Sequence, residues 1–206
     1  VKAANRILAE EGKTQRITAA DIRLLGVKRL VARLRPPIYR IPFYVSKLRR
    51  YTGLEMHTVK PFKGIKTALR QLKKSYKLAL VTSNSKENVE LFFKKHGMRG
   101  LFGLVIANVG IFGKQKALKH AVKAAGCRKE EAACVGDEVR DVEAAKKLGV
   151  RIICCTWGFN SRKLLEESKP DSIISSPREL LAAVENLNKP FTEQPSSPPG
   201  LGNKVS

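Results

Sequence analysis

Short apolar runs alternate with helical patterns along residues 60–188, and this alternation constrains the fold most. Runs such as LALV (78–81), ACVG (133–136) and RIICC (151–155) are each followed by an amphipathic stretch. Continuous apolar runs are typical of parallel strands that are buried on both faces. Short connections between strand and helix favour a doubly wound sheet. We therefore predict an α/β fold over residues 59–188, with a doubly wound, mostly parallel, Rossmann-like sheet.

The first 58 residues predict helices alone. Apolar residues recur at helical spacing from the start of the chain, and Thr18 with Asp21 forms a capping-box pattern. A later helical pattern stops at Pro36-Pro37. We predict a small all-helical domain over residues 1–58, incomplete at its start because Val1 already lies inside a helical pattern.

The last 18 residues have a different composition. Residues 189–206 are rich in Pro, Ser and Gly and offer little apolar surface to bury. We predict a disordered tail.

The chain is strongly basic, with 40 Lys and Arg against 18 Asp and Glu and a net charge of +22. This charge attracts anions in general. The basic residues are spread over nearly every helix, and aromatic residues are only 6% of the chain, without a platform for stacking bases. A generally basic surface is therefore favoured over a nucleic-acid partner.

Hydropathy and cysteine usage exclude other classes. The longest weakly polar stretch, residues 100–113, is too short for a bilayer span, so no membrane partner is expected. The four cysteines form no CxxC pair, which favours reduced thiols in a cytoplasmic protein. The oligomeric state stays open.

Three groups of polar residues follow three successive apolar runs. They are the Thr82-Ser83-Asn84-Ser85 segment, Lys114 at the start of a helix, and the pair Asp137 and Asp141. Each has a plain structural reading, as a helix N-cap, a solvated lysine or helix-terminal acids. In a parallel sheet, however, all three meet at the carboxyl edge, where ligands bind.

The three groups together offer the parts that phosphoryl transfer needs. Hydroxyl and backbone N–H groups can hold an anion, and an ammonium group can neutralise its charge. Asp137 and Asp141 are hard oxygen ligands that suit Mg²⁺. Their i, i+4 spacing predicts one face of an opening helical turn, where the helix dipole lowers their pKa. Gly136 permits close backbone approach there.

In order and spacing these residues resemble the haloacid dehalogenase-like hydrolase superfamily, and more closely its phosphoglycolate-phosphatase-like members. Thr82 is similar to the second motif, Lys114 to the third, and Gly136 to Asp141 to the GDxxxD form of the fourth. The resemblance implies catalytic roles for Thr82, Lys114, Asp137 and Asp141, with Mg²⁺ held by the two aspartates. The helical segment 1–58 is similar to the cap of such proteins.

The resemblance also exposes a difference. The first motif of the superfamily is Asp-x-Asp on the central first strand, and its leading aspartate attacks phosphorus. No Asp-x-Asp occurs in this chain, whose remaining aspartates are Asp21 and Asp171. We therefore expect no nucleophile and no central strand here, through loss of an upstream segment or through true loss of the motif.

These points give the expected function. The resemblance implies a Mg²⁺-dependent phosphatase of a small, phosphoglycolate-like phosphate monoester, with phosphate held by Thr82, Ser83, Asn84 and Lys114. The chain as it stands is expected to be inactive. The alternative is a catalytically inactive binding or regulatory protein on the same scaffold.

Overall fold

Five strands and the helices between them make up the layered part of the molecule. The computed structural model describes residues 1–56, 58–110 and 113–188. The strands are β1 (Ala79–Val81), β2 (Leu104–Ile106), β3 (Ala133–Gly136), β4 (Arg151–Cys155) and β5 (Ser172–Ile174). The helices of this part are α4 (Ile65–Ser75), α5 (Lys86–His96), α6 (Lys114–Ala125), α7 (Val139–Leu148), α8 (Arg162–Glu167) and α9 (Leu180–Asn188), with short 3₁₀ turns at Lys129–Glu131 and Pro177–Glu179.

All strand pairs are parallel, as the sequence predicts, and the sheet is in two pieces. One piece pairs β1 with β2, and the other has the order β3-β4-β5. Within the described residues no strand joins β1 to β3. Val135 on β3 is 43% exposed, although Ile153, its partner in register on β4, is fully buried. The exposed edge of β3 agrees with the expectation that a central strand is missing.

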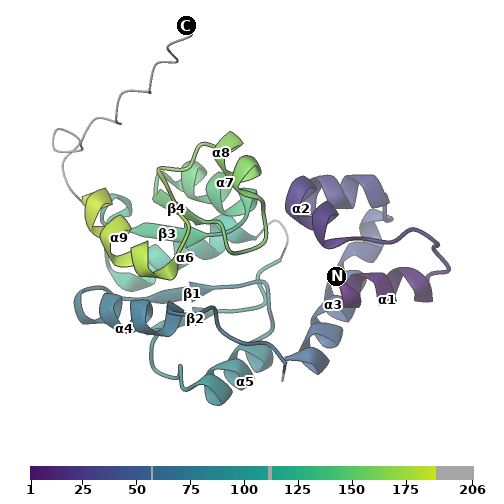
Figure 1. Cartoon of the computed structure of the whole chain (residues 1–206), viewed down its shortest axis with the longest axis horizontal. Coiled ribbons are helices and arrows are strands. Elements are labelled where there is room, and N and C mark those ends of the chain that lie inside the picture. The colour runs from purple at the N-terminus through teal and green to yellow at the C-terminus, as the bar shows by residue number, and fades with distance from the viewer. Residues whose placement is uncertain (57, 111–112, 189–206) are drawn as a thin grey trace, which may run out of the picture.

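Strand β4 forms the centre of the core because both of its faces are covered. Ile152 and Cys154 pack with α7 and α8, whereas Ile153 and Cys155 pack with α4 and α9. Alternate residues of β4 thus face opposite layers of helices, as expected of a strand that is buried on both faces. Helix α6 contacts α7 and β1, and α4 contacts α9, so helices on both faces hold the two pieces of the sheet together (Figure 1).

The first 56 residues are helical and lie to one side of the layered part (Figure 1). They form what we call the cap helices: α1 (Lys2–Glu10), α2 (Ala19–Leu34) and α3 (Ile41–Glu55), with a 3₁₀ turn at Ile38–Arg40. The predicted capping box is present, because the Thr18 hydroxyl accepts from the Asp21 N–H and the Asp21 carboxylate accepts from the Thr18 N–H. Gly26, with φ of 68°, kinks α2. The boundary between residues 58 and 59 stays a prediction.

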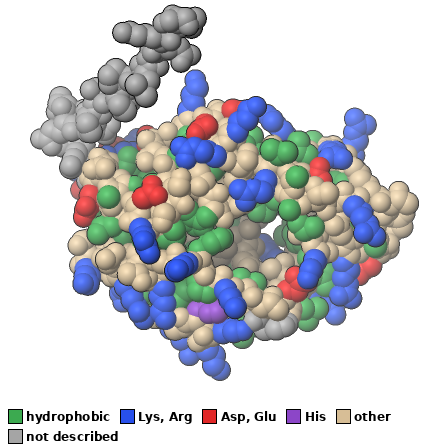
Figure 2. Space-filling view, viewed as in Figure 1, with side chains coloured by type: hydrophobic (Ala, Val, Ile, Leu, Met, Phe, Trp, Pro, Cys, Tyr) green, Lys and Arg blue, Asp and Glu red, His purple; other side chains and the backbone are tan. Residues whose placement is uncertain are grey.

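Two further predictions concern the surface and the tail. The predicted disordered tail, residues 189–206, lies outside the described residues. On the face seen in Figure 2, Lys and Arg side chains lie over both parts, and the molecule is hollowed between them. Among the described helices, none combines the length and the apolar character that a membrane crossing demands.

Candidate active site

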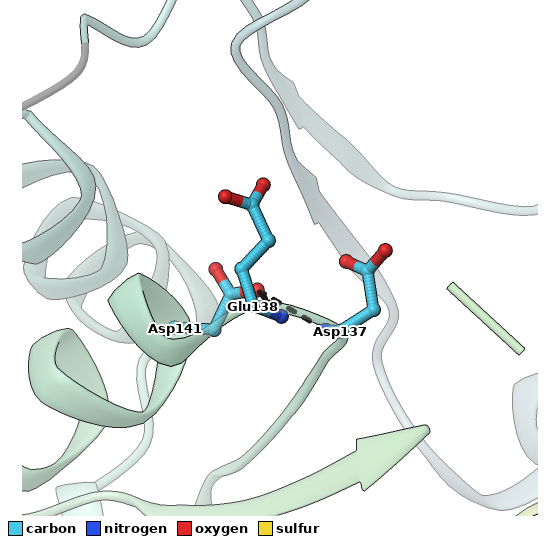
Figure 3. A group of neighbouring side chains, drawn as sticks. All are labelled: Asp137, Glu138 and Asp141. Carbon is cyan, nitrogen blue, oxygen red and sulfur yellow. Dashed lines mark hydrogen bonds between the residues drawn. The ribbon is translucent and has the colours of Figure 1, made fainter. Parts of the chain in front are cut away.

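The acidic loop after β3 brings three carboxylates together. Ligand oxygens of Asp137, Glu138 and Asp141 all lie within 4.8 Å of one another. Figure 3 shows their side chains rising from the same side of the loop. The predicted helical face is wrong in detail, because α7 begins only at Val139, after Asp137. The loop folds back instead: Asp141 Oδ2 accepts from the N–H groups of Asp137 and Glu138, at 3.2 and 3.1 Å.

Two glycines lie against the aspartates at positions where a side chain would not fit. A Cβ on Gly136 would lie 2.5 Å from the Asp141 Cβ, so Asp141 can lie against this residue only because it has no side chain. A Cβ on Gly158, in the loop after β4, would lie 2.2 Å from Asp137 Oδ2. Any side chain at these two positions would push an aspartate away.

Lys114 is the cation of this site. It is the first residue of α6, and its ammonium group forms an ion pair with Asp141 Oδ1. Glu138 Oε1 lies 3.8 Å from the same ammonium nitrogen. A lysine at a helix N-terminus is unfavourable, because the dipole there is positive, so the carboxylates compensate for that position.

A buried ion pair between Glu138 and Arg140 was not predicted. The Arg140 guanidinium donates to both Glu138 oxygens, at 2.8 and 2.9 Å, and only 9% of its side chain is exposed. Residues at i, i+2 do not face each other on a helix. The pair forms because Glu138 is the N-cap and lies outside the helix. The GDEVRD segment contained both charges, but spacing alone gave no reason to join them.

Burial dominates the electrostatics of Asp137. It raises the pKa of the Asp137 carboxyl above its ordinary value, with the nearby Asp141 charge as the second cause. Burial likewise raises the pKa of Glu138. The predicted lowering by the helix dipole is therefore wrong for Asp137, because dehydration of the carboxylate outweighs the dipole. A cation beside this carboxylate would stabilise its charged form.

The polar loop after β1 carries the residues that are predicted to hold phosphate. The Thr82 hydroxyl accepts from the Asn84 N–H at 3.1 Å, and Ser85 is the N-cap of α5. The Asn84 side chain accepts from the Ser85 N–H and from the Asn88 amide. The Asn84 N–H and side-chain oxygen are thus engaged within the loop and with α5, whereas the proton of the Thr82 hydroxyl can be donated to an anion.

The loop after β2 links Thr82 to Lys114. The Val109 N–H donates to the Thr82 carbonyl at 3.0 Å. Gly113, which precedes Lys114, lies against Val109, because a Cβ built on Gly113 would be 3.4 Å from Val109 Cγ1. From the cap, the Arg49 guanidinium donates to the carbonyls of Ser83 and Val109, at 2.8 and 3.3 Å. The loops that carry Thr82 and Lys114 are therefore neighbours, and α3 reaches both.

The donor set of the acidic loop fits Mg²⁺. Carboxylate oxygens are the ligands that this ion prefers, and one or two of them suffice beside water and phosphate. Asp141 is shared between Lys114 and the loop N–H groups, and Glu138 is shared between Arg140 and Lys114. Asp137 accepts from the Phe159 N–H at 2.7 Å. Asp137 is the carboxylate whose charge is least compensated, so it is the best placed to bind a metal directly.

The three cysteines of strands β3 and β4 offer no substitute nucleophile. Burial raises the pKa of Cys134, Cys154 and Cys155 to about 12. Their thiols therefore stay protonated at neutral pH, and the thiolate is the reactive form.

Comparison with known sequences identifies the class of protein to which this fold and site belong. A sequence profile of haloacid dehalogenase-like hydrolases matches residues 1–155. The chain belongs to this family.

Two individual proteins are also similar to this chain in sequence. The chain is 37% identical over 144 residues to a phosphoglycolate phosphatase of Synechococcus elongatus, covering 69% of this chain and 68% of the relative. It is 25% identical to pyrophosphatase PpaX of Bacillus cereus, covering 64% and 62%. The match thus spans about two thirds, or less, of each relative's length.

Solved structures show the same fold. A predicted phosphatase from Clostridium acetobutylicum superposes with a TM-score of 0.77 at 18% identity, covering 90% of this chain and 89% of that one. A predicted phosphoglycolate phosphatase from Haemophilus somnus gives 0.69 at 19% identity, covering 88% of each. At this identity the likeness concerns architecture alone.

Proposed function

We propose that this chain carries the phosphate and metal sites of a Mg²⁺-dependent phosphatase that acts on a small, phosphoglycolate-like phosphate monoester. The observation that carries the proposal is the contact of Lys114 with Asp141, beside the half-buried Asp137. A cation and under-compensated carboxylates at the end of a parallel strand are suited to a divalent ion and a phosphate together. Membership of the family and the 37% identity to a phosphoglycolate phosphatase support the same function.

Each residue has a distinct role in this proposal. Asp137 holds Mg²⁺ and Asp141 orients both Lys114 and the loop, while Lys114 neutralises phosphoryl charge. The Thr82 hydroxyl and the Ser83 N–H each donate a hydrogen bond to a phosphoryl oxygen. When bound, Mg²⁺ polarises the phosphoryl group and offsets its negative charge. The cap helices exclude water and set specificity.

The proposal includes the inactivity of the chain by itself. The sequence holds no Asp-x-Asp, and the buried cysteines are protonated. Within the described residues β3 pairs with β4 alone, and Val135 on β3 is 43% exposed. The same observations favour the alternative of an inactive binding or regulatory protein that keeps the phosphate and metal sites.

Calorimetric titration with Mg²⁺ tests the metal site directly. We expect the wild-type chain to bind Mg²⁺, Asp137→Asn to lose most of this affinity, and the exposed Glu167→Gln on α8 to keep it. Equal binding by the wild type and Asp137→Asn would refute the assignment.

Hydrolysis of p-nitrophenyl phosphate separates the enzyme from the inactive protein. The chain as it stands should show no metal-dependent activity above background. The coding sequence upstream of Val1 is the second observation: a strand that ends in Asp-x-Asp there, restored to the chain, should produce activity. A start codon nearby without this motif supports the inactive alternative.

A further inference from the structure

The loop of residues 156–161, between β4 and α8, connects the cap helices to the metal-binding aspartate. On its inner side, the Phe159 N–H donates to Asp137 Oδ2 at 2.7 Å, and the Asn160 N–H donates to the Asp137 carbonyl at 3.0 Å. Both the side chain and the backbone of Asp137 are therefore held by this loop.

The outer side of the same loop is held by helix α2. The Ser161 N–H donates to the Arg23 carbonyl at 2.8 Å. The Arg23 guanidinium donates to the carbonyls of Gly158 and Thr156, at 3.2 and 3.5 Å. Arg23 itself is exposed, so these contacts come from the surface of the cap.

Asn160 joins the two sides. It is 1% exposed, the most buried polar residue in the described part of the chain. Its Oδ1 accepts from the Val139 N–H, at the start of α7, at 2.9 Å, and its amide donates to the Ile22 carbonyl of α2 at 3.4 Å. One planar amide thus bonds the cap on one side and the acidic loop on the other, and a buried amide keeps its partners because losing them is costly.

From this geometry we propose that Asn160 is a positioning residue, which couples the docking of α2 to the orientation of Asp137. The inference rests on the proposed metal site and adds a residue outside the family motifs. Groups behind a metal ligand fix its orientation, so a change in the cap reaches the metal through this loop. The coupling is reciprocal: a ligand that favours one arrangement of Asp137 also favours docked α2.

Two variants separate coupling from simple loss of folding. Asn160→Asp keeps the acceptor for Val139 but removes the donor to Ile22. Arg23→Met removes the two guanidinium bonds to the carbonyls of Gly158 and Thr156 and changes only an exposed side chain, while the bonds to the backbone carbonyls of α2 remain. The matched control is Arg40→Met, which breaks an exposed ion pair with Glu11 inside the cap and leaves the loop untouched.

The experiment is Mg²⁺ calorimetry on the full 206-residue chain, with hydrogen exchange of the α2 amides as a second readout. We expect Asn160→Asp to weaken Mg²⁺ binding by about tenfold. Arg23→Met should weaken it several-fold, and Arg40→Met should match the wild type. Mg²⁺ should slow exchange in α2 of the wild type and have less effect in Asn160→Asp.

The outcomes are distinct. Normal binding by Arg23→Met, with unchanged exchange in α2, would overturn the coupling and leave the metal site standing. Absence of Mg²⁺ binding by the wild type would overturn the proposed function and the coupling together. If Asn160→Asp does not fold, Arg23→Met decides the matter alone.

Discussion

Lys114 and Asp141 form an ion pair that joins the first turn of α6 to the first turn of α7, with 15% and 9% of their side chains exposed. Removing either charge leaves the other mostly buried with weaker compensation, because Lys114 then keeps only Glu138, 3.8 Å away, and Asp141 keeps only the two loop N–H groups. In the proposed function the same ammonium group neutralises phosphoryl charge, so a single contact would serve both the packing of two helices and the proposed chemistry.

The first prediction concerns this pair. Asp141→Asn keeps an oxygen for the Asp137 and Glu138 N–H groups but leaves the Lys114 ammonium with Glu138 alone, whose Oε1 is 3.8 Å away. We expect the free energy of unfolding to fall by about 3 kcal/mol in urea denaturation. The double variant Lys114→Met/Asp141→Asn should recover part of that loss, because the under-compensated charge is gone. A double variant less stable than the sum of both single changes would contradict this account.

The second prediction concerns the glycine before the acidic loop. Gly136→Ala places a methyl group 2.5 Å from the Asp141 Cβ, so the loop has to move. We expect a loss of about 2 kcal/mol in the free energy of unfolding. Gly110→Ala is the control, because no atom of the described residues lies within 4 Å of a Cβ there. Similar losses in both variants would show that Gly136 matters through chain flexibility and not through contact with Asp141.

The third prediction uses the pKa of Asp137, which burial raises above its ordinary 3.8. The folded chain then holds this proton at pH values where the unfolded chain has released it. The free energy of unfolding therefore falls as pH rises from 3.8 through the raised pKa, and the penalty is complete above it. Asp137→Asn removes the penalty, so without Mg²⁺ it should be more stable than the wild type at neutral pH.

Thermal unfolding measured over this pH range checks the sign. The advantage of Asp137→Asn should shrink towards acid pH and disappear near the ordinary pKa. Mg²⁺ should reverse the order at neutral pH, because a bound cation stabilises the wild-type carboxylate. An Asp137→Asn variant less stable than the metal-free wild type at neutral pH would contradict the direction of the shift.

Much of this fold is local in origin and could be predicted. The apolar runs at 78–81, 133–136 and 151–155 correspond to β1, β3 and β4, because parallel strands buried on both faces leave a continuous apolar signature. Lys114, Asp137 and Asp141 were also found from the sequence, since each directly follows or nearly follows such a run. The division of the sheet into two pieces was expected only because the sequence lacks the Asp-x-Asp motif of the central strand.

The remainder depends on contacts that spacing does not encode. Asn160 touches Val139 and Ile22, which are far away along the chain. The Glu138 and Arg140 pair depends on where α7 begins, and the pKa of Asp137 depends on how deeply the loop is buried. Burial and long-range hydrogen bonds arise only when the cap and the layers are assembled.

The last prediction concerns the open edge of β3. Val135 is 43% exposed beside the fully buried Ile153, and an unpaired strand edge with an exposed apolar side chain invites pairing with another chain. We expect the wild-type chain to associate with rising concentration in sedimentation velocity experiments, and Val135→Lys to remain monomeric, since a charged side chain on an edge strand opposes pairing. Leu91→Lys is the control, because it adds the same charge at an equally exposed apolar residue, 48% exposed, on helix α5. If both variants suppress association equally, added charge is the cause and the edge of β3 is not the contact.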